Sequence, residues 1–130
     1  MTVVVSAALA LAACEGARAP EDPGVCWQRT DAGGQAHFSR LAEQVESLEN
    51  CAVLLEALRL QGQSHTDGAF QGYYIFVNDR SISSSPSAGR HGYPIFQPPQ
   101  RDEIDRDLQR LIKERGGKMP TAADIAIERK

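Results

Sequence analysis

The chain of 130 residues has no stretch of about 20 consecutive apolar residues, so no segment predicts a helix that spans a membrane. It has no excess of basic residues either, because 14 Lys and Arg stand against 17 Asp and Glu, for a net charge of −3. A nucleic-acid-binding protein would show a basic patch or stripe. We therefore expect no nucleic-acid partner.

Sequence motifs for catalysis and for cofactors are also missing. The chain contains no C-x-x-C, C-x-x-C-H, G-x-S-x-G or H-E-x-x-H motif and no glycine-rich phosphate-binding loop. The acidic run around Asp102–Asp107 lacks the glycine and the spaced ligands of a calcium loop. We expect no catalytic residue, no metal site and no cofactor.

The chain does have an uncharged start. Residues from Val3 to Leu11 are all small or aliphatic, which suits the core of a signal peptide and is too short to cross a bilayer. The run ends in Leu11-Ala12-Ala13-Cys14. This sequence resembles the lipobox of bacterial lipoproteins, in which a Leu and two small residues precede the cysteine that receives a diacylglyceryl group. The resemblance covers the leader alone.

The resemblance implies that residues 1–13 are removed as a signal peptide and that Cys14 carries the lipid. Stable anchoring takes more than one acyl chain, and a triacylated cysteine supplies them. Glu15 follows the cysteine where an Asp often marks retention in the inner membrane, so the outer membrane is favoured. We expect a lipid-anchored protein of the bacterial cell envelope that faces the periplasm.

Two other interpretations of the leader stay open, because no Lys or Arg precedes the apolar run. An ordinary signal peptidase could cleave at Ala8-Leu9-Ala10, or the run could belong to the fold. In either case residues 14–24, rich in proline and glycine, have the composition of a tether.

With the first thiol lipidated, Cys26 and Cys51 remain in an oxidising compartment, and parity predicts a disulfide between them. In the chain-entropy model a loop of this size stabilises the fold by about 3.5 kcal/mol. Residues 25–97 would form the disulfide-linked domain. Residues 98–130 would form a C-terminal helix and tail.

For this domain we predict an α+β fold, in which a long amphipathic helix packs on an antiparallel sheet of three or four strands and a C-terminal amphipathic helix follows. Apolar residues at spacings of three and four predict the long helix at about 36–60; they are Phe38, Leu41, Val45, Leu48, Ala52 and Leu55. Predicted strands cover Val25–Gln28, 69–77, Arg80–Ser84 and Tyr93–Phe96, and residues 30–34 are expected to form a turn.

The stretch from Arg101 to Arg115 predicts a second helix with a narrow apolar stripe of Ile104, Leu108, Leu111 and Ile112. This helix could dock on the domain or bind a partner. Residues 118–130 are expected to form a mobile tail, with a short helix possible from Thr121.

These patterns favour a non-enzymatic accessory or protein-binding subunit of the envelope. Its partner would bind through an aromatic strand face or through the second helix; the residues concerned are Tyr73, Tyr74, Phe76, Ile104, Leu108 and Leu111. The alternatives are a small periplasmic ligand-binding module, or a small hydrolase that uses His65 and nearby polar groups.

Overall fold

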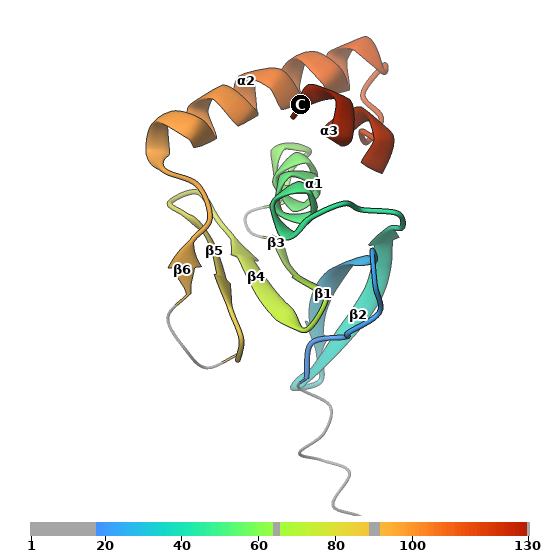
Figure 1. The fold of residues 1–130 in the computed structure, drawn as a ribbon, viewed down its shortest axis with the longest axis vertical. Coiled ribbons are helices and arrows are strands. Elements are labelled where there is room, and N and C mark those ends of the chain that lie inside the picture. Colours follow the sequence, from blue (N-terminus) through green and yellow to red (C-terminus); the bar gives the residue numbers. More distant parts are fainter. Residues whose placement is uncertain (1–17, 64–65, 89–91, 130) are drawn as a thin grey trace, which may run out of the picture.

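The computed structural model describes residues 18–63, 66–88 and 92–129, so the predictions for Cys14, for the leader and for His65 lie outside the described residues. The fold is α+β, as expected, with six strands and three helices in the described part of the chain (Figure 1). In chain order the elements are β1 (Cys26–Ala32), β2 (Gln35–Ala42), α1 (Leu48–Leu60), β3 (Thr66–Phe70), β4 (Tyr73–Val77), β5 (Ile82–Ser85), β6 (Tyr93–Pro94), α2 (Pro98–Glu114) and α3 (Ala122–Glu128).

All six strands form one antiparallel sheet in the order β2-β1-β3-β4-β5-β6. The expectation of three or four strands was therefore too low. Two hairpins account for the difference. The turn predicted at 30–34 is confirmed at Gly33 and Gly34, but it leads into a strand where a helix was predicted, and a second turn lies inside the single strand predicted at 69–77.

The first hairpin joins β1 to β2 through Gly33 and Gly34, whose φ angles are +60° and +77°. Two central residues with positive φ suit the twist of paired strands, and Ala32 pairs with Gln35 across the turn. The predicted helix at 36–60 is therefore wrong in its first part, since Phe38 lies in β2. Its spacing from the later apolar residues matches a helix only by coincidence.

Helix α1 begins at Leu48 because Ser47 caps it. The Ser47 hydroxyl accepts a hydrogen bond from the backbone N–H of Asn50 at 3.1 Å, which satisfies one of the free donors of the first turn. The helix ends at Leu60, and Gly62 follows with a φ of +118°. The predicted end of the helix is confirmed, and its true length is 13 residues.

The second hairpin divides the single strand predicted at 69–77 into β3 and β4. Gln71 and Gly72 form its turn, with φ angles of +45° and +88°. Phe70 and Tyr73 face each other across this turn. Phe70 therefore belongs to the core under α1, whereas Tyr74 belongs to the cluster on the other face.

The molecule has three layers, with α1 between the sheet and the pair formed by α2 and α3 (Figure 1). The core on both sides of α1 is continuous; its largest fully buried apolar side chains are Leu54, Leu55, Ile75, Val77, Ile82, Leu108 and Ile125. The predicted disulfide is confirmed. Cys26 on β1 and Cys51 on α1 are fully buried, with their Cα atoms 5.3 Å apart, so the bond links helix to sheet.

The close approach of α1 to the sheet requires the absence of a side chain at Gly68, on β3. A Cβ there would lie 2.6 Å from Leu55 Cδ1 and 2.2 Å from the backbone oxygen of Trp27. Such a contact forces backbone or side-chain shifts in a close-packed core. Gly68 therefore sets the distance between α1 and the sheet.

The sheet face opposite α1 carries a smaller cluster of Ala19, Ala69 and Tyr74, with Trp27, Phe38 and Phe76 packed against it. The chain at residues 18–24 lies on the β3–β4 hairpin. The Gly72 N–H donates to the carbonyl of Pro20 at 2.9 Å, and the Gly24 N–H donates to Gln71 Oε1 at 2.9 Å. This part of the expected tether is fixed to the domain.

The C-terminal region packs on the domain as well. The second predicted helix is confirmed as α2, and it begins at Pro98 because a proline is tolerated in the first turn, where the missing N–H has no helical partner. The short helix from Thr121 is confirmed as α3, with a reciprocal Thr121–Asp124 capping box. Ile125 of α3 is buried in the core, so residues 118–129 are not a tail.

No helix in the described ranges is long and apolar enough to cross a membrane.

Candidate binding cleft

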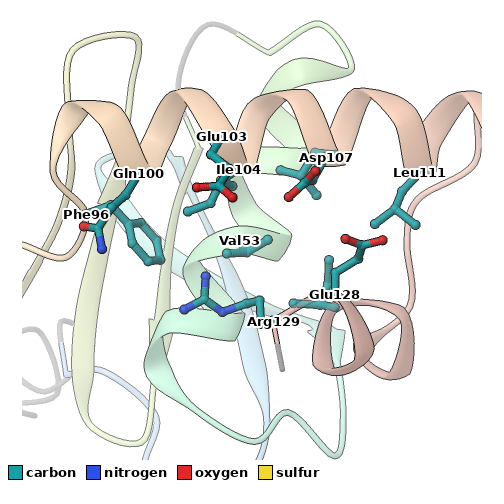
Figure 2. Close-up of a pocket in the computed structure, with 11 residues that line it drawn as sticks. Val53, Phe96, Gln100, Glu103, Ile104, Asp107, Leu111, Glu128 and Arg129 are labelled. Carbon is teal, nitrogen blue, oxygen red and sulfur yellow. The ribbon is translucent and has the colours of Figure 1, made fainter.

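An open cleft of about 220 Å³ lies where α2 and α3 cross above α1 (Figure 2). Its apolar residues are Val53 of α1, Phe96, Ile104, Leu108, Leu111 and Ile125, and its polar residues are Gln100, Glu103, Asp107, Glu128 and Arg129. The cleft therefore combines an apolar floor with a charged rim.

The floor follows from the helical periodicity of α2. Ile104, Leu108 and Leu111 recur at spacings of four and three, so they share the face that α2 turns toward α1. Leu108 is buried in the centre of this face, whereas Ile104 and Leu111 are partly exposed on either side of it. Since α3 covers only part of the same face, the remainder stays open as the cleft.

The rim is mainly acidic. Glu103 and Asp107 lie one turn apart on α2, and Figure 2 shows both at the cleft with Glu128 of α3 on the opposite side. Arg110 binds Glu128 and reaches Asp107 only at 3.9 Å. Within the described ranges Glu103 has no ion-pair partner.

One basic group of the chain lies at the other end of the cleft. The guanidinium carbon of Arg129 is 5.1 Å from the centre of the Phe96 ring, in cation–π geometry (Figure 2). An aromatic wall and an acidic rim both favour positive charge.

A buried ionic cluster fixes α2 to α1 near the cleft. Glu56 of α1 is 0% exposed, and it accepts a hydrogen bond from Arg59 and lies 2.7 Å from Arg101 Nη2 of α2. Arg101 also donates to the backbone carbonyl of Asn78, after β4. Charges buried this deeply need a partner, and the ion pair together with the Arg101–Asn78 hydrogen bond joins α2 to α1 and to the chain after β4.

Asp105 adjoins this cluster from α2. Burial raises the pKa of the Asp105 carboxyl, and the negative charge of Glu56 raises it further. One of its carboxylate oxygens is buried and accepts no hydrogen bond from the described residues. The folded state therefore disfavours the charged form of this carboxyl, although Arg101 and Arg59 offset part of the effect.

The predicted partner-binding residues separate into two groups. Ile104, Leu108 and Leu111 come together in the cleft. Tyr74 is buried in the cluster on the far face of the sheet with Phe76 packed on it, while Tyr73 points to the opposite face and is 51% exposed. The aromatic strand thus offers no single exposed surface.

Sequence reasoning missed the cleft's other walls and the ionic cluster. Glu56 was a usable signal, because it is the only charged residue in the buried stretch from Cys51 to Ala57. A lone charge inside an apolar run is expected to have a buried partner. Phe96, Glu128 and Arg129 gave no comparable signal, since only the crossing of α2 and α3 brings them together.

The lining of the cleft combines six apolar side chains with Gln100, three carboxylates and one guanidinium. The described residues contain no group of three or more His, Cys, Asp or Glu arranged to hold a metal ion. Apolar groups with a few placed charges are typical of binding sites.

The chain matches no protein-family model, and neither a curated protein nor a solved structure matches it.

Proposed function

We propose that this protein is a lipid-anchored, non-enzymatic binding subunit of the bacterial cell envelope, and that it holds a protein partner in the cleft between α2 and α3. The observation that carries the proposal is the cleft itself. Its floor is formed by the apolar face of α2. Its rim carries three carboxylates, of which Asp107 and Glu128 pair with Arg110 while Glu103 has no ion-pair partner among the described residues.

The cleft is built on elements that the fold fixes in place. Helix α2 is held by the Glu56–Arg101 ion pair and by Leu108, which is buried in the core. Helix α3 is held by Ile125 and by an ion pair between Arg115 and Asp124 at 2.9 Å. Binding groups on rigid elements lose little conformational entropy when a partner binds.

The proposed location is supported by the cysteines. The Cys26–Cys51 disulfide is fully buried, and such structural disulfides form and persist in oxidising compartments such as the periplasm. The lipobox-like Leu11-Ala12-Ala13-Cys14 supplies the proposed anchor on the third cysteine, followed by Glu15 for the outer membrane.

The hollow shape of the cleft also favours a second candidate function, a small periplasmic ligand-binding module. Pockets that enclose drug-sized ligands usually measure about 300–1,000 Å³. At about 220 Å³ the cleft is smaller, and it is open along one side. A side chain projecting from a larger partner surface fits this shape better than a free ligand that must be enclosed.

Site-specific photo-crosslinking in intact envelopes tests the partner. A photoreactive residue at Glu103, on the rim, should give one defined protein adduct. The same residue at Arg106, which is exposed on α2 outside the cleft, is the matched control and should not give this adduct. Equal adducts from both positions, or none from Glu103, would contradict binding at the cleft.

Intact-mass measurement of protein purified from membranes tests the anchor. We expect loss of residues 1–13, added acyl mass on Cys14, and two hydrogens fewer than the reduced chain because of the disulfide. A mass that retains the leader and shows no acyl group would refute the lipid-anchored part of the proposal.

A further inference from the structure

We infer that the cleft receives one basic side chain, a lysine or an arginine, from the protein partner. The inference rests on the proposed function and names the chemistry that its site recognises. Three features support it: the charge of the rim, the shape of the floor, and the position of the chain's own Arg129.

The described part of the rim carries negative charge that its own ion pairs do not fully use. Glu103, Asp107 and Glu128 contribute three carboxylates, and Arg129 is the only basic residue among the described lining residues. Arg110, outside the cleft, pairs with Glu128 and, at 3.9 Å, with Asp107, so Glu103 is the carboxylate without an ion-pair partner in the described ranges. An incoming cation would therefore find two adjacent acceptors on one turn of α2, beside apolar groups that weaken solvent screening.

The floor suits the stem of a basic side chain. Lysine and arginine lay their methylene groups along apolar surface while the charged end stays near polar groups. Ile104 and Leu111 form such a surface directly beside Glu103 and Asp107 (Figure 2). The volume of about 220 Å³ accommodates one such side chain without enclosing a larger ligand.

Arg129 shows which end of the cleft remains open to a cation. Its guanidinium already lies over Phe96, 5.1 Å from the ring centre. A second cation is repelled from that end and directed toward Glu103 and Asp107. The partner's side chain should therefore enter along α2, between these two carboxylates and Leu111.

A peptide titration tests the inference directly. The probe is an acetylated and amidated Leu-Lys-Leu tripeptide, added to the full chain with its disulfide intact and followed by methyl NMR signals of Val53, Ile104 and Leu111. Charge-assisted contacts predict that it binds about tenfold more tightly than a Leu-norleucine-Leu peptide of similar shape. A Leu-Glu-Leu peptide should not shift these signals.

Two variants and a matched control locate the binding. Asp107→Asn and Glu103→Gln should each weaken the lysine peptide about threefold. Asp102→Asn is the control, since Asp102 is exposed on the same helix and lies outside the cleft, and it should leave binding unchanged. Equal binding of the lysine and norleucine peptides, or no effect of Asp107→Asn, would overturn the inference.

Three further outcomes distinguish a protein side chain from a free amine as the bound cation, and distinguish failure of this inference from failure of the proposed function. If cadaverine, a free diamine, binds as tightly as the lysine peptide, the assignment to a protein side chain is wrong. If no lysine peptide binds while the Glu103 crosslink persists, only this inference fails. If the peptide binds but the crosslink is absent, the inference about the cleft holds and the proposed partner fails.

Discussion

The two sides of α1 are held by different chemistry. Toward the sheet, α1 is joined by the Cys26–Cys51 disulfide and packs Leu55 over Gly68. Toward α2, its buried charge Glu56 meets Arg101, beside the apolar contact of Leu108. The first contact is covalent and apolar, whereas the second combines apolar packing with an ion pair.

The difference separates stability from geometry. A disulfide acts mainly by limiting the unfolded chain, and apolar contact is not directional, so the sheet side chiefly stabilises α1. The Glu56–Arg101 ion pair and the hydrogen bond from Arg101 to the Asn78 carbonyl require particular positions of α2 relative to α1 and β4, so this side of α1 chiefly positions α2.

Removal of the disulfide should have the largest effect. We expect the double variant Cys26→Ala/Cys51→Ala to lose about 3.5 kcal/mol of unfolding free energy, measured by urea denaturation under oxidising conditions. Reductant should destabilise the wild type and leave the variant unchanged. If both proteins respond equally to reductant, the sheet side of α1 does not depend on this bond.

Replacement of Glu56 should weaken the contact between α1 and α2. In Glu56→Gln the buried Arg101 keeps its charge without the carboxylate, at a cost of about 3 kcal/mol in unfolding free energy. Glu49→Gln, in the exposed first turn of the same helix, is the control and should cost at most about 0.5 kcal/mol. Similar losses of unfolding free energy in the two variants would show that the buried ion pair of Glu56 does not stabilise the fold more than an exposed charge does.

Two isoleucines of α3 test how strongly this helix packs on α1. Ile125 is 1% exposed and Ile127 is 71% exposed. Ile125→Ala should lower the unfolding free energy by about 2.5 kcal/mol, while Ile127→Ala should change it by less than about 0.5 kcal/mol. Thermal unfolding of the pair checks this, and equal effects would mean that α3 does not pack on α1.

The smallest expected effect is an increase in unfolding free energy, in the variant Asp105→Asn. Its folded-state pKa lies above the ordinary value because of burial and of Glu56. The carboxyl therefore contributes stability that is present below its ordinary pKa and is lost as the pH rises through the raised value. Asp105→Asn should stabilise the protein at pH 7 relative to the wild type, and this advantage should disappear at pH 3.

Urea denaturation at both pH values measures this difference. Asp79→Asn, at an exposed position after β4 that is not among the charges acting on Asp105, is the control and should show no such pH dependence. An equal advantage for Asp105→Asn at the two pH values would show that the charge of Asp105 is not the cause.

The sequence predicted those parts of the fold that depend on local pattern. The disulfide followed from parity, and the end of α1 and α2 from Arg101 onward followed from their apolar spacing, whereas the start of α2 at Pro98 was missed by three residues. The helix prediction was wrong for residues 36–47, because apolar residues can also recur at spacings of three and four in a strand followed by a loop. The twin glycines at Gly33-Gly34 carried the decisive hairpin signal.

The candidate site was only partly predictable. The apolar stripe of α2 identified Ile104, Leu108 and Leu111, because one helix determines which residues share its face. Glu128 and Arg129 join them through the packing of α3, which depends on distant contacts. Sequence spacing contains no information about such a crossing of helices.

The attachment of residues 18–24 to the β3–β4 hairpin limits how far the domain could stand from a lipid on Cys14. A lipid on Cys14 would be separated by five residues from Pro20, which a backbone hydrogen bond holds to the hairpin, and this distance is at most about 20 Å. In Figure 1 residues 18–24, in blue, lie on the sheet side of the molecule, away from α2 and α3. Lipidation at Cys14 would therefore keep the sheet close to the bilayer. The cleft would then lie on the side of the molecule that faces away from this membrane.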